Sequence, residues 1–129
     1  MNVLYLNFGE KQQVPVAFNI LSFRKFCEHY GVEFEEMGEV LESKSLLGLT
    51  DIIYFGHLAY CSLNGRTPEI SHDESTMFAE AADEQVMTRV QEAIYNAKIM
   101  GKTLREMREQ NENAAENAPE KKIQNPEND

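Results

Sequence analysis

The sequence of 129 residues contains no tryptophan and only two cysteines, Cys27 and Cys61. Two cysteines do not make a disulfide framework, and both lie among apolar residues. We therefore expect two reduced, buried thiols that pack as small apolar side chains. Residues 1–6 lack the basic region and apolar stretch of a signal peptide, so the expected compartment is the cytoplasm. The longest apolar stretch, residues 52–61, is too short to span a bilayer.

Basic residues are scarce, with 12 Lys and Arg against 22 Asp and Glu and a net charge of −10. Phosphate backbones repel such a surface, so we expect no nucleic-acid partner. Anionic membranes are disfavoured for the same reason. The simplest interpretation of the charge is solubility. A second interpretation is a basic protein partner, or mimicry of nucleic acid.

Motifs that carry catalysis are also missing. The seven glycines are scattered singly, so the chain has no glycine-rich phosphate loop and no Gly-x-Ser-x-Gly elbow. His72, Asp73 and Glu74 follow Ser71, and a helix cap explains this group better than acid–base chemistry does. No nucleophile, base and oxyanion donor occur together. We expect a protein that is not an enzyme and needs no cofactor.

One group of residues has the composition of a metal site: Cys27, His29, His57 and Cys61. His57 and Cys61 are four residues apart and share a helix face, but Cys27 and His29 would diverge on a helix. Zinc sites use tighter spacings such as Cys-x-x-Cys. We therefore expect no metal, and a His57 that is either hydrogen-bonded or at the surface.

The first half of the chain predicts a β-hairpin followed by three helices. Residues 1–18 are β-prone around a turn at 9–11, and Pro15 suits an edge strand. A helix is expected over 20–30, capped by Asn19 or Ser22 and ended by Gly31. A short helix over 35–42 has a strongly acidic outer face. Residues 51–63 are apolar nearly all round, which is typical of a central buried helix, and its Gly56 would allow close approach of another backbone.

The second half predicts two more helices, over about 74–82 and from about Asp83 onward. Apolar residues recur every three or four positions in the last helix, although Gly101 interrupts it. This stripe comprises Val86, Val90, Ala93, Ala97, Met100, Leu104 and Met107. Residues 111–129 hold almost no large apolar side chains and predict a disordered acidic, Asn-rich tail. The expected fold is mainly α (α+β), with one domain over 1–110 formed by the hairpin and four or five helices around the central one.

The stripe of the last helix is the most functional-looking feature. Its first half suits the core, whereas the Met-rich second half has little remaining chain to cover it. Methionine side chains adapt to an incoming apolar helix. The residues we expect to bind a partner are Val90, Ile94, Met100, Leu104 and Met107.

The order of three segments resembles the tail assembly chaperones of long-tailed bacteriophages and prophages. The first segment, 16–31, is a strand and a helix with Phe23-Arg24-Lys25-Phe26 at its centre and Tyr30-Gly31 at its end. The second, 51–60, is an apolar helix containing Phe55-Gly56. The third is the acidic cap Ser71-His72-Asp73-Glu74. The resemblance covers about residues 14–100, which includes the helices that follow this cap.

The resemblance implies a non-catalytic helical protein in the bacterial host cytoplasm. It would bind the tape measure protein and keep its apolar helices soluble until tail tube subunits polymerise around it. The tape measure protein and the tail tube subunit are therefore the expected partners. The alternative is an acidic inhibitor or antitoxin-like protein of a mobile element, whose binding to a basic protein would depend strongly on salt.

Overall fold

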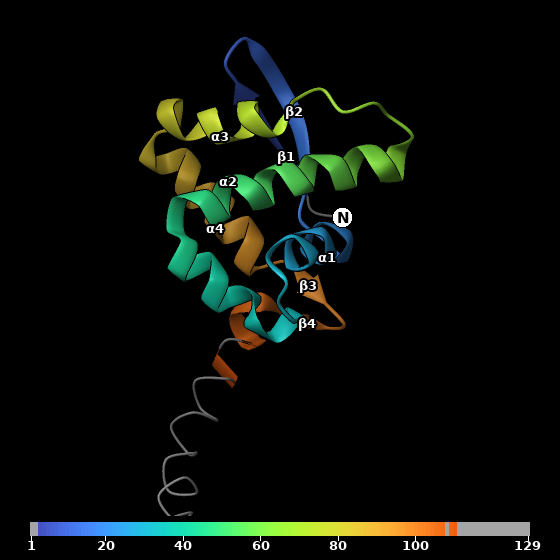
Figure 1. Cartoon of the computed structure of the whole chain (residues 1–129), viewed down its shortest axis with the longest axis vertical. Coiled ribbons are helices and arrows are strands. Elements are labelled where there is room, and N and C mark those ends of the chain that lie inside the picture. The colour runs from blue at the N-terminus through green and yellow to red at the C-terminus, as the bar shows by residue number, and fades with distance from the viewer. Residues whose placement is uncertain (1–2, 108, 111–129) are drawn as a thin grey trace, which may run out of the picture.

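A computed structural model describes residues 3–107 and 109–110 (Figure 1). It has a mainly helical α+β fold in which an N-terminal hairpin precedes the helices, as the sequence predicts. The predicted disordered tail, residues 111–129, lies outside the described residues.

The hairpin pairs β1 (Val3–Phe8) with β2 (Lys11–Ala17) in antiparallel register. Gly9 takes a positive φ of 63° in the turn, a conformation that glycine adopts without strain. Pro15 lies opposite Tyr5 in a sheet of only two strands, where its missing N–H donor is tolerated. Val14, Val16 and the other residues at the end of β2 are buried, so the hairpin is part of the core.

Helix α1 (Ile20–Tyr30) has the predicted bounds because local signals set both of its ends. The Ser22 amide donates to Oδ1 of Asn19, and the Asn19 amide donates to Oγ of Ser22, which makes a capping box. At the other end Gly31 takes the left-handed conformation, with φ of 67°.

Helix α2 (Met37–Asn64) follows the short 3-10 helix η1 (Phe34–Glu36) and runs without interruption through residues 43–50. The prediction of two helices, over 35–42 and 51–63, is therefore wrong. Gly48 does not break the helix, because Leu41 and Leu49 on either side of it are buried in the core. Figure 1 shows α2 changing direction between its teal and green parts. Thr50 Oγ1 donates back to the Leu47 carbonyl at 3.2 Å, a bond that bends helices.

The second part of α2 is the centre of the fold, as the sequence predicts. Ile52, Ile53 and Ala59 are fully buried. Gly56 faces β2 so closely that a methyl group there would lie 2.6 Å from Cγ1 of Val16. By length and composition the stretch Leu46–Asn64 could cross a membrane, but 61% of its most apolar window is buried within the protein. Such burial is typical of a core helix.

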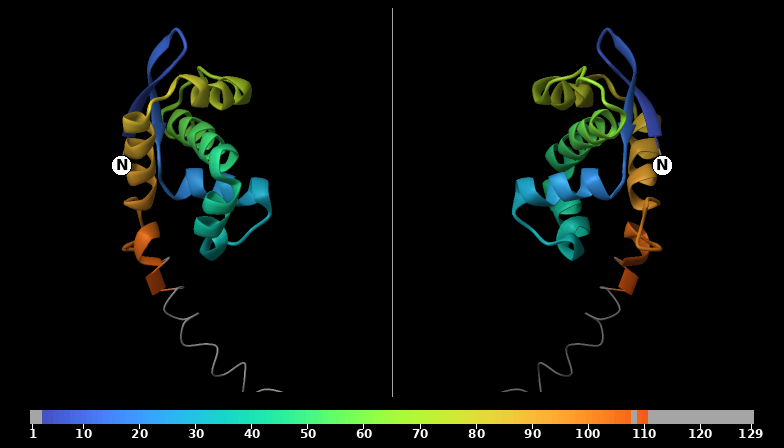
Figure 2. Two further views of the ribbon diagram at one scale, coloured as in Figure 1. Left: turned by 90° about the vertical axis from the view of Figure 1, so that its left-hand side faces the viewer. Right: turned by 90° about the vertical axis from the view of Figure 1, so that its right-hand side faces the viewer.

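Helix α3 (His72–Ala81) starts at the predicted capping box, in which Oγ of Ser71 accepts from the Glu74 amide. Helix α4 (Glu84–Tyr95) begins at the Asp83 cap. Figure 2 shows the blue hairpin between α4 (gold) on one side and the green part of α2 on the other. Helices distant in sequence therefore lie on both sides of the base of the hairpin.

The predicted continuation of the last helix to Met107 is wrong, because α4 ends at Tyr95. A second hairpin follows, formed by β3 (Lys98–Ile99) and β4 (Lys102–Thr103). Its two turn residues, Met100 and Gly101, both have positive φ, at 54° and 84°. Helical conformation resumes at Leu104. The apolar stripe is therefore divided between α4, the turn and this last helical segment.

Candidate functional site: a groove between α2 and α4

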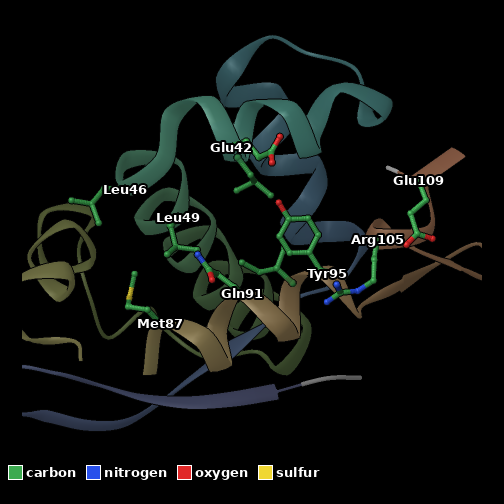
Figure 3. Close-up of a pocket in the computed structure, with 10 residues that line it drawn as sticks. Glu42, Leu46, Leu49, Met87, Gln91, Tyr95, Arg105 and Glu109 are labelled. Carbon is green, nitrogen blue, oxygen red and sulfur yellow. The ribbon is translucent and has the colours of Figure 1, made fainter. Parts of the chain in front are cut away.

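The first part of α2, α4 and the segment after β4 together enclose an open groove of about 600 Å³ (Figure 3). Side chains from residues more than sixty positions apart in sequence meet here. The groove is lined by Leu41, Glu42, Leu46, Leu49, Met87, Gln91, Ile94, Tyr95, Arg105 and Glu109.

One end of the groove is apolar. Leu41, Leu49 and Ile94 are buried and contribute to its floor. Leu46 is 51% exposed, and with the half-buried Met87 it leaves apolar surface accessible at this end. Figure 3 shows Leu46, Leu49 and Met87 gathered on the same side. Exposed apolar surface beside a concave site marks a place where another apolar group can bind.

The other end of the groove carries charge. Figure 3 shows Glu42 on α2 and Arg105 and Glu109 on the last segment, around the ring of Tyr95. The Arg105 guanidinium lies 6.0 Å from the centre of the Tyr95 ring, a cation–π contact that holds the arginine against α4. The groove therefore changes from apolar to charged along its length.

The five residues predicted to bind a partner do not share one surface. Val90, Ile94 and Leu104 are buried in the core, and Ile94 is the one member that lines the groove. Met100 is 95% exposed at the tip of the β3–β4 turn. Met107 is half-buried and packs against the core. The spacing of three and four residues along the stripe predicts one helix face, but these residues do not share one because α4 ends at Tyr95, before Met100.

The α2 side of the groove was not predicted. Glu39, Glu42, Leu46 and Leu49 are spaced by three, four and three residues, which places them on one stripe of a helix. That signal was present in the sequence, but it becomes visible only when residues 43–50 are recognised as helical.

A second cluster of polar side chains surrounds the nearly buried carboxylate of Asp51. The Tyr30 hydroxyl donates to Oδ2 of Asp51 at 2.5 Å, and Nε2 of His72 lies 2.6 Å from Oδ1. Nε2 of His29 lies 3.7 Å from Oδ2. Burial and the Asp51 contact both raise the pKa of the Tyr30 phenol above its ordinary value. These contacts join α1, α2 and α3, and so Asp51 has a structural role.

His57 is fully buried and joins three segments. Its Nδ1 donates to the Pro15 carbonyl at 2.8 Å, while its Nε2 accepts from the Glu69 amide at 2.8 Å. This arrangement requires the neutral ring with the proton on Nδ1. It matches the predicted hydrogen-bonded alternative for His57.

The four residues that have the composition of a metal site lie in different environments. Cys61 lies 3.5 Å from Nε2 of His57, whereas His29 faces Asp51. Cys27 and Cys61 are free, buried thiols, as predicted. Across residues 3–107 and 109–110, no three His, Cys, Asp or Glu side chains are grouped so as to hold a metal ion.

No family model, curated protein or solved structure matches this chain.

Proposed function

We propose that this protein is a non-catalytic tail assembly chaperone of a bacteriophage or prophage, which binds the tape measure protein and keeps it soluble. The groove between α2 and α4 is the observation that carries the proposal. It offers apolar side chains from two helices, Leu46 and Met87, over a floor of buried residues. An amphipathic client helix can lay its apolar face into a groove of this kind.

Energetics and charge support this function. Burying one large apolar side chain contributes roughly 1.5–3 kcal/mol, so one groove gives a weak site. A long client offers many such sites, so its coverage rises with the number of chaperone molecules bound along it. The net charge of −10 keeps such a complex soluble.

Co-expression tests the proposal. The chain is produced with the helix-rich tape measure protein from the same genome, and the soluble fraction of the client is measured. We expect the client to be soluble only with the chaperone, in a complex that survives about 0.5 M salt because apolar contacts are not screened. A client that is equally soluble alone, with no complex, contradicts the proposal. The tail tube subunit is tested in the same way as a second partner.

The alternative function is an acidic inhibitor that binds a basic protein. The supporting observation is the run of exposed or half-exposed acidic residues around η1 and the start of α2: Glu33, Glu35, Glu36 and Glu39. Salt screens exposed charges, so the affinity for a partner bound through this surface would fall steeply between about 0.05 and 0.5 M salt. The salt dependence of the isolated complex therefore separates the two functions.

A further inference from the structure

We propose that the outer edge of β1 is a second interaction surface, which binds an extended, non-acidic segment of another protein as a third strand of the N-terminal sheet. This surface is separate from the groove between α2 and α4, and binding to it does not require the proposed chaperone function. Two features define it: free backbone groups along β1, and two hollows that lie beside them against α4.

Pro15 determines which backbone groups of β1 are free. Because proline has no N–H, Tyr5 and Pro15 cannot exchange hydrogen bonds, and they form a non-hydrogen-bonded pair. The Pro15 carbonyl accordingly points away from β1 and accepts from Nδ1 of His57 on α2 at 2.8 Å. The N–H and C=O groups of Tyr5 therefore point away from β2, toward the outer edge. Those of Val3, two residues earlier, point the same way.

The outer edge of β1 is open, whereas that of β2 is covered by α2, which bonds to Pro15 and approaches Ala17 closely at Gly56. Within the part of the chain that the structure describes, neither Val3 nor Tyr5 makes a backbone hydrogen bond on its outer side. Strand edges are usually protected by charged residues or proline, and β1 contains neither. Its register shift lies after Leu6, beyond the two free residues.

Two hollows lie along this edge, and Figure 2 shows α4 (gold) beside the start of β1 (dark blue). The first, of about 270 Å³, lies between Leu4 and Ala93 of α4. The second, of about 230 Å³, lies between Leu6 and Val86 of α4. Leu4 and Leu6 are two residues apart and so point to the same face. In a strand added beside β1, the two residues opposite them would point to that face as well and enter the hollows.

The hollows favour a segment of another protein over a second copy of this chain. If β1 of a second copy paired here about Tyr5, Leu6 and Leu4 of that copy would lie opposite Leu4 and Leu6. Leu6 is only 2% exposed within its own chain, so it cannot also fill a hollow in a partner. The net charge of −10 makes two copies repel and disfavours an acidic segment for the same reason.

The expected occupant is therefore an extended segment with apolar residues at two alternate positions, about 7 Å apart, and with neutral or basic residues around them. Its backbone bonds to Val3 and Tyr5, and its two apolar side chains enter the hollows. In this mode of recognition the backbone supplies affinity and the side-chain pockets supply specificity. We expect antiparallel addition, which is the more stable arrangement per residue.

The probe is a labelled peptide of about eight residues, a usual strand length, with valine at the two alternate positions, threonine elsewhere and lysine at each end. Fluorescence anisotropy with the full chain gives its Kd. Hydrogen exchange followed by NMR reports on the edge itself. In the free chain the Val3 and Tyr5 amides should exchange at least about tenfold faster than the Leu4 and Leu6 amides, which face β2. Bound peptide should slow the first pair at least about tenfold.

Matched peptides test the backbone contact in the unaltered protein. N-methylation of the residue between the two valines removes the N–H that faces Tyr5 and should weaken binding at least about tenfold. N-methylation of one valine removes an N–H that points away from β1 and should change the Kd less than about threefold. Aspartate at both valine positions should weaken binding at least about tenfold, because the hollows offer it little compensation for lost water. Glutamate in place of the terminal lysines should weaken it about threefold.

Variants of the chain locate the binding. Tyr5→Pro removes the outward N–H without removing a bond between β1 and β2, and it should weaken binding at least about tenfold. Tyr5→Thr keeps that N–H and should bind within about threefold of the unaltered chain. Ala93→Leu fills the first hollow and should also weaken binding, whereas Ala79→Leu, half-buried on α3 and outside both hollows, should not. Circular dichroism checks that each variant folds.

Several results would overturn the inference. These are unchanged exchange of the Val3 and Tyr5 amides at about 1 mM peptide, equal binding of the two methylated peptides, or tighter binding of the glutamate peptide. A dimer of the chain that Tyr5→Pro dissociates also overturns it, because the occupant is then a second copy. Leu46→Asp alters the groove between α2 and α4 and should leave peptide binding unchanged. Loss of binding with Leu46→Asp would place the peptide in that groove and remove the strand site.

Discussion

At Gly56, helix α2 comes within van der Waals distance of β2. An added methyl group would lie 2.6 Å from Cγ1 of Val16 and 2.9 Å from the Ala17 carbonyl oxygen. We expect Gly56→Ala to lower the free energy of unfolding by about 1–3 kcal/mol, the usual range for overpacking. Urea denaturation measures it.

The matched control for this change is Gly38→Ala. Gly38 lies in the same helix with no atom near an added methyl group. There alanine should raise the stability by about 0.4–1 kcal/mol, because it reduces the entropy of the unfolded chain. Equal stabilities for both variants would contradict the close approach of α2 and β2.

The thiol of Cys27 makes the stability of the protein depend on pH. Burial, followed by the charges of Glu33, Glu35 and Glu36, raises the pKa of this thiol from 9.0 to about 11. The folded state therefore holds the proton more tightly than the unfolded state. The contribution of this pKa difference to the free energy of unfolding is fully present below about pH 9 and is lost as the pH rises through about 11. Tyr30, whose pKa is also raised, adds a loss of the same sign at higher pH.

Denaturation at pH 8 and pH 10.5 tests this expectation, with lower stability at the higher pH. Cys27→Ala should reduce the difference between the two values. At pH 8 the folded protein should also react slowly with an aromatic disulfide reagent, because little thiolate is present. Rapid reaction of both cysteines without unfolding would contradict a buried, protonated Cys27.

At the scale of single elements, one residue, Met100, strains the turn of the second hairpin. Met100 and Gly101 both have positive φ between the paired Ile99 and Lys102, as in a type I′ turn. Asparagine tolerates this conformation better than methionine does. We expect Met100→Asn to raise the free energy of unfolding by about 0.5–1 kcal/mol, measured by thermal denaturation. Met100→Val, with a β-branched side chain at the same exposed position, should lower it.

The same turn shows what the sequence could and could not predict. The ends of α1 and the start of α3 were predictable, because Asn19, Gly31 and Ser71 act on their own neighbours. The end of α4 was not, because its C-cap Asn96 stays right-handed and no glycine marks the place where the helix stops. The two parts of α2 were separated because the predicted helices left residues 43–50 unassigned, and the burial of Leu41 and Leu49 becomes known only from the structure.

The groove was harder to predict than the elements around it. Of the predicted partner-binding residues, only Ile94 lines it, and only as part of its buried floor. Periodicity finds one face of one helix, whereas this site combines faces of three segments. Their meeting depends on how α2 bends and where α4 ends, which are properties of the tertiary structure.

At the scale of the whole molecule, Asp51 links three helices. Asp51→Asn leaves an amide that cannot accept from Tyr30 and His72 as the two carboxylate oxygens do. We expect a loss of about 1–3 kcal/mol of stability, the usual result when a buried donor loses its acceptor. Hydrogen exchange should show reduced protection in α1 and α3 together. Reduced protection in α2 alone would contradict the linking role, and Asp73→Asn provides an exposed control.

The position of the N-terminal hairpin between α2 and α4 has a consequence for synthesis. Both strands leave the ribosome before α4 does, and Leu4 can line a pocket with Glu92 and Ala93 of α4 only after some ninety further residues are made. Contacts of such long separation in sequence close late and slow folding. A nascent chain that stops before α4 leaves one face of β1 exposed to water and to other chains. Completion of the domain therefore has to wait for α4, and chains truncated before α4 should aggregate instead of folding partially.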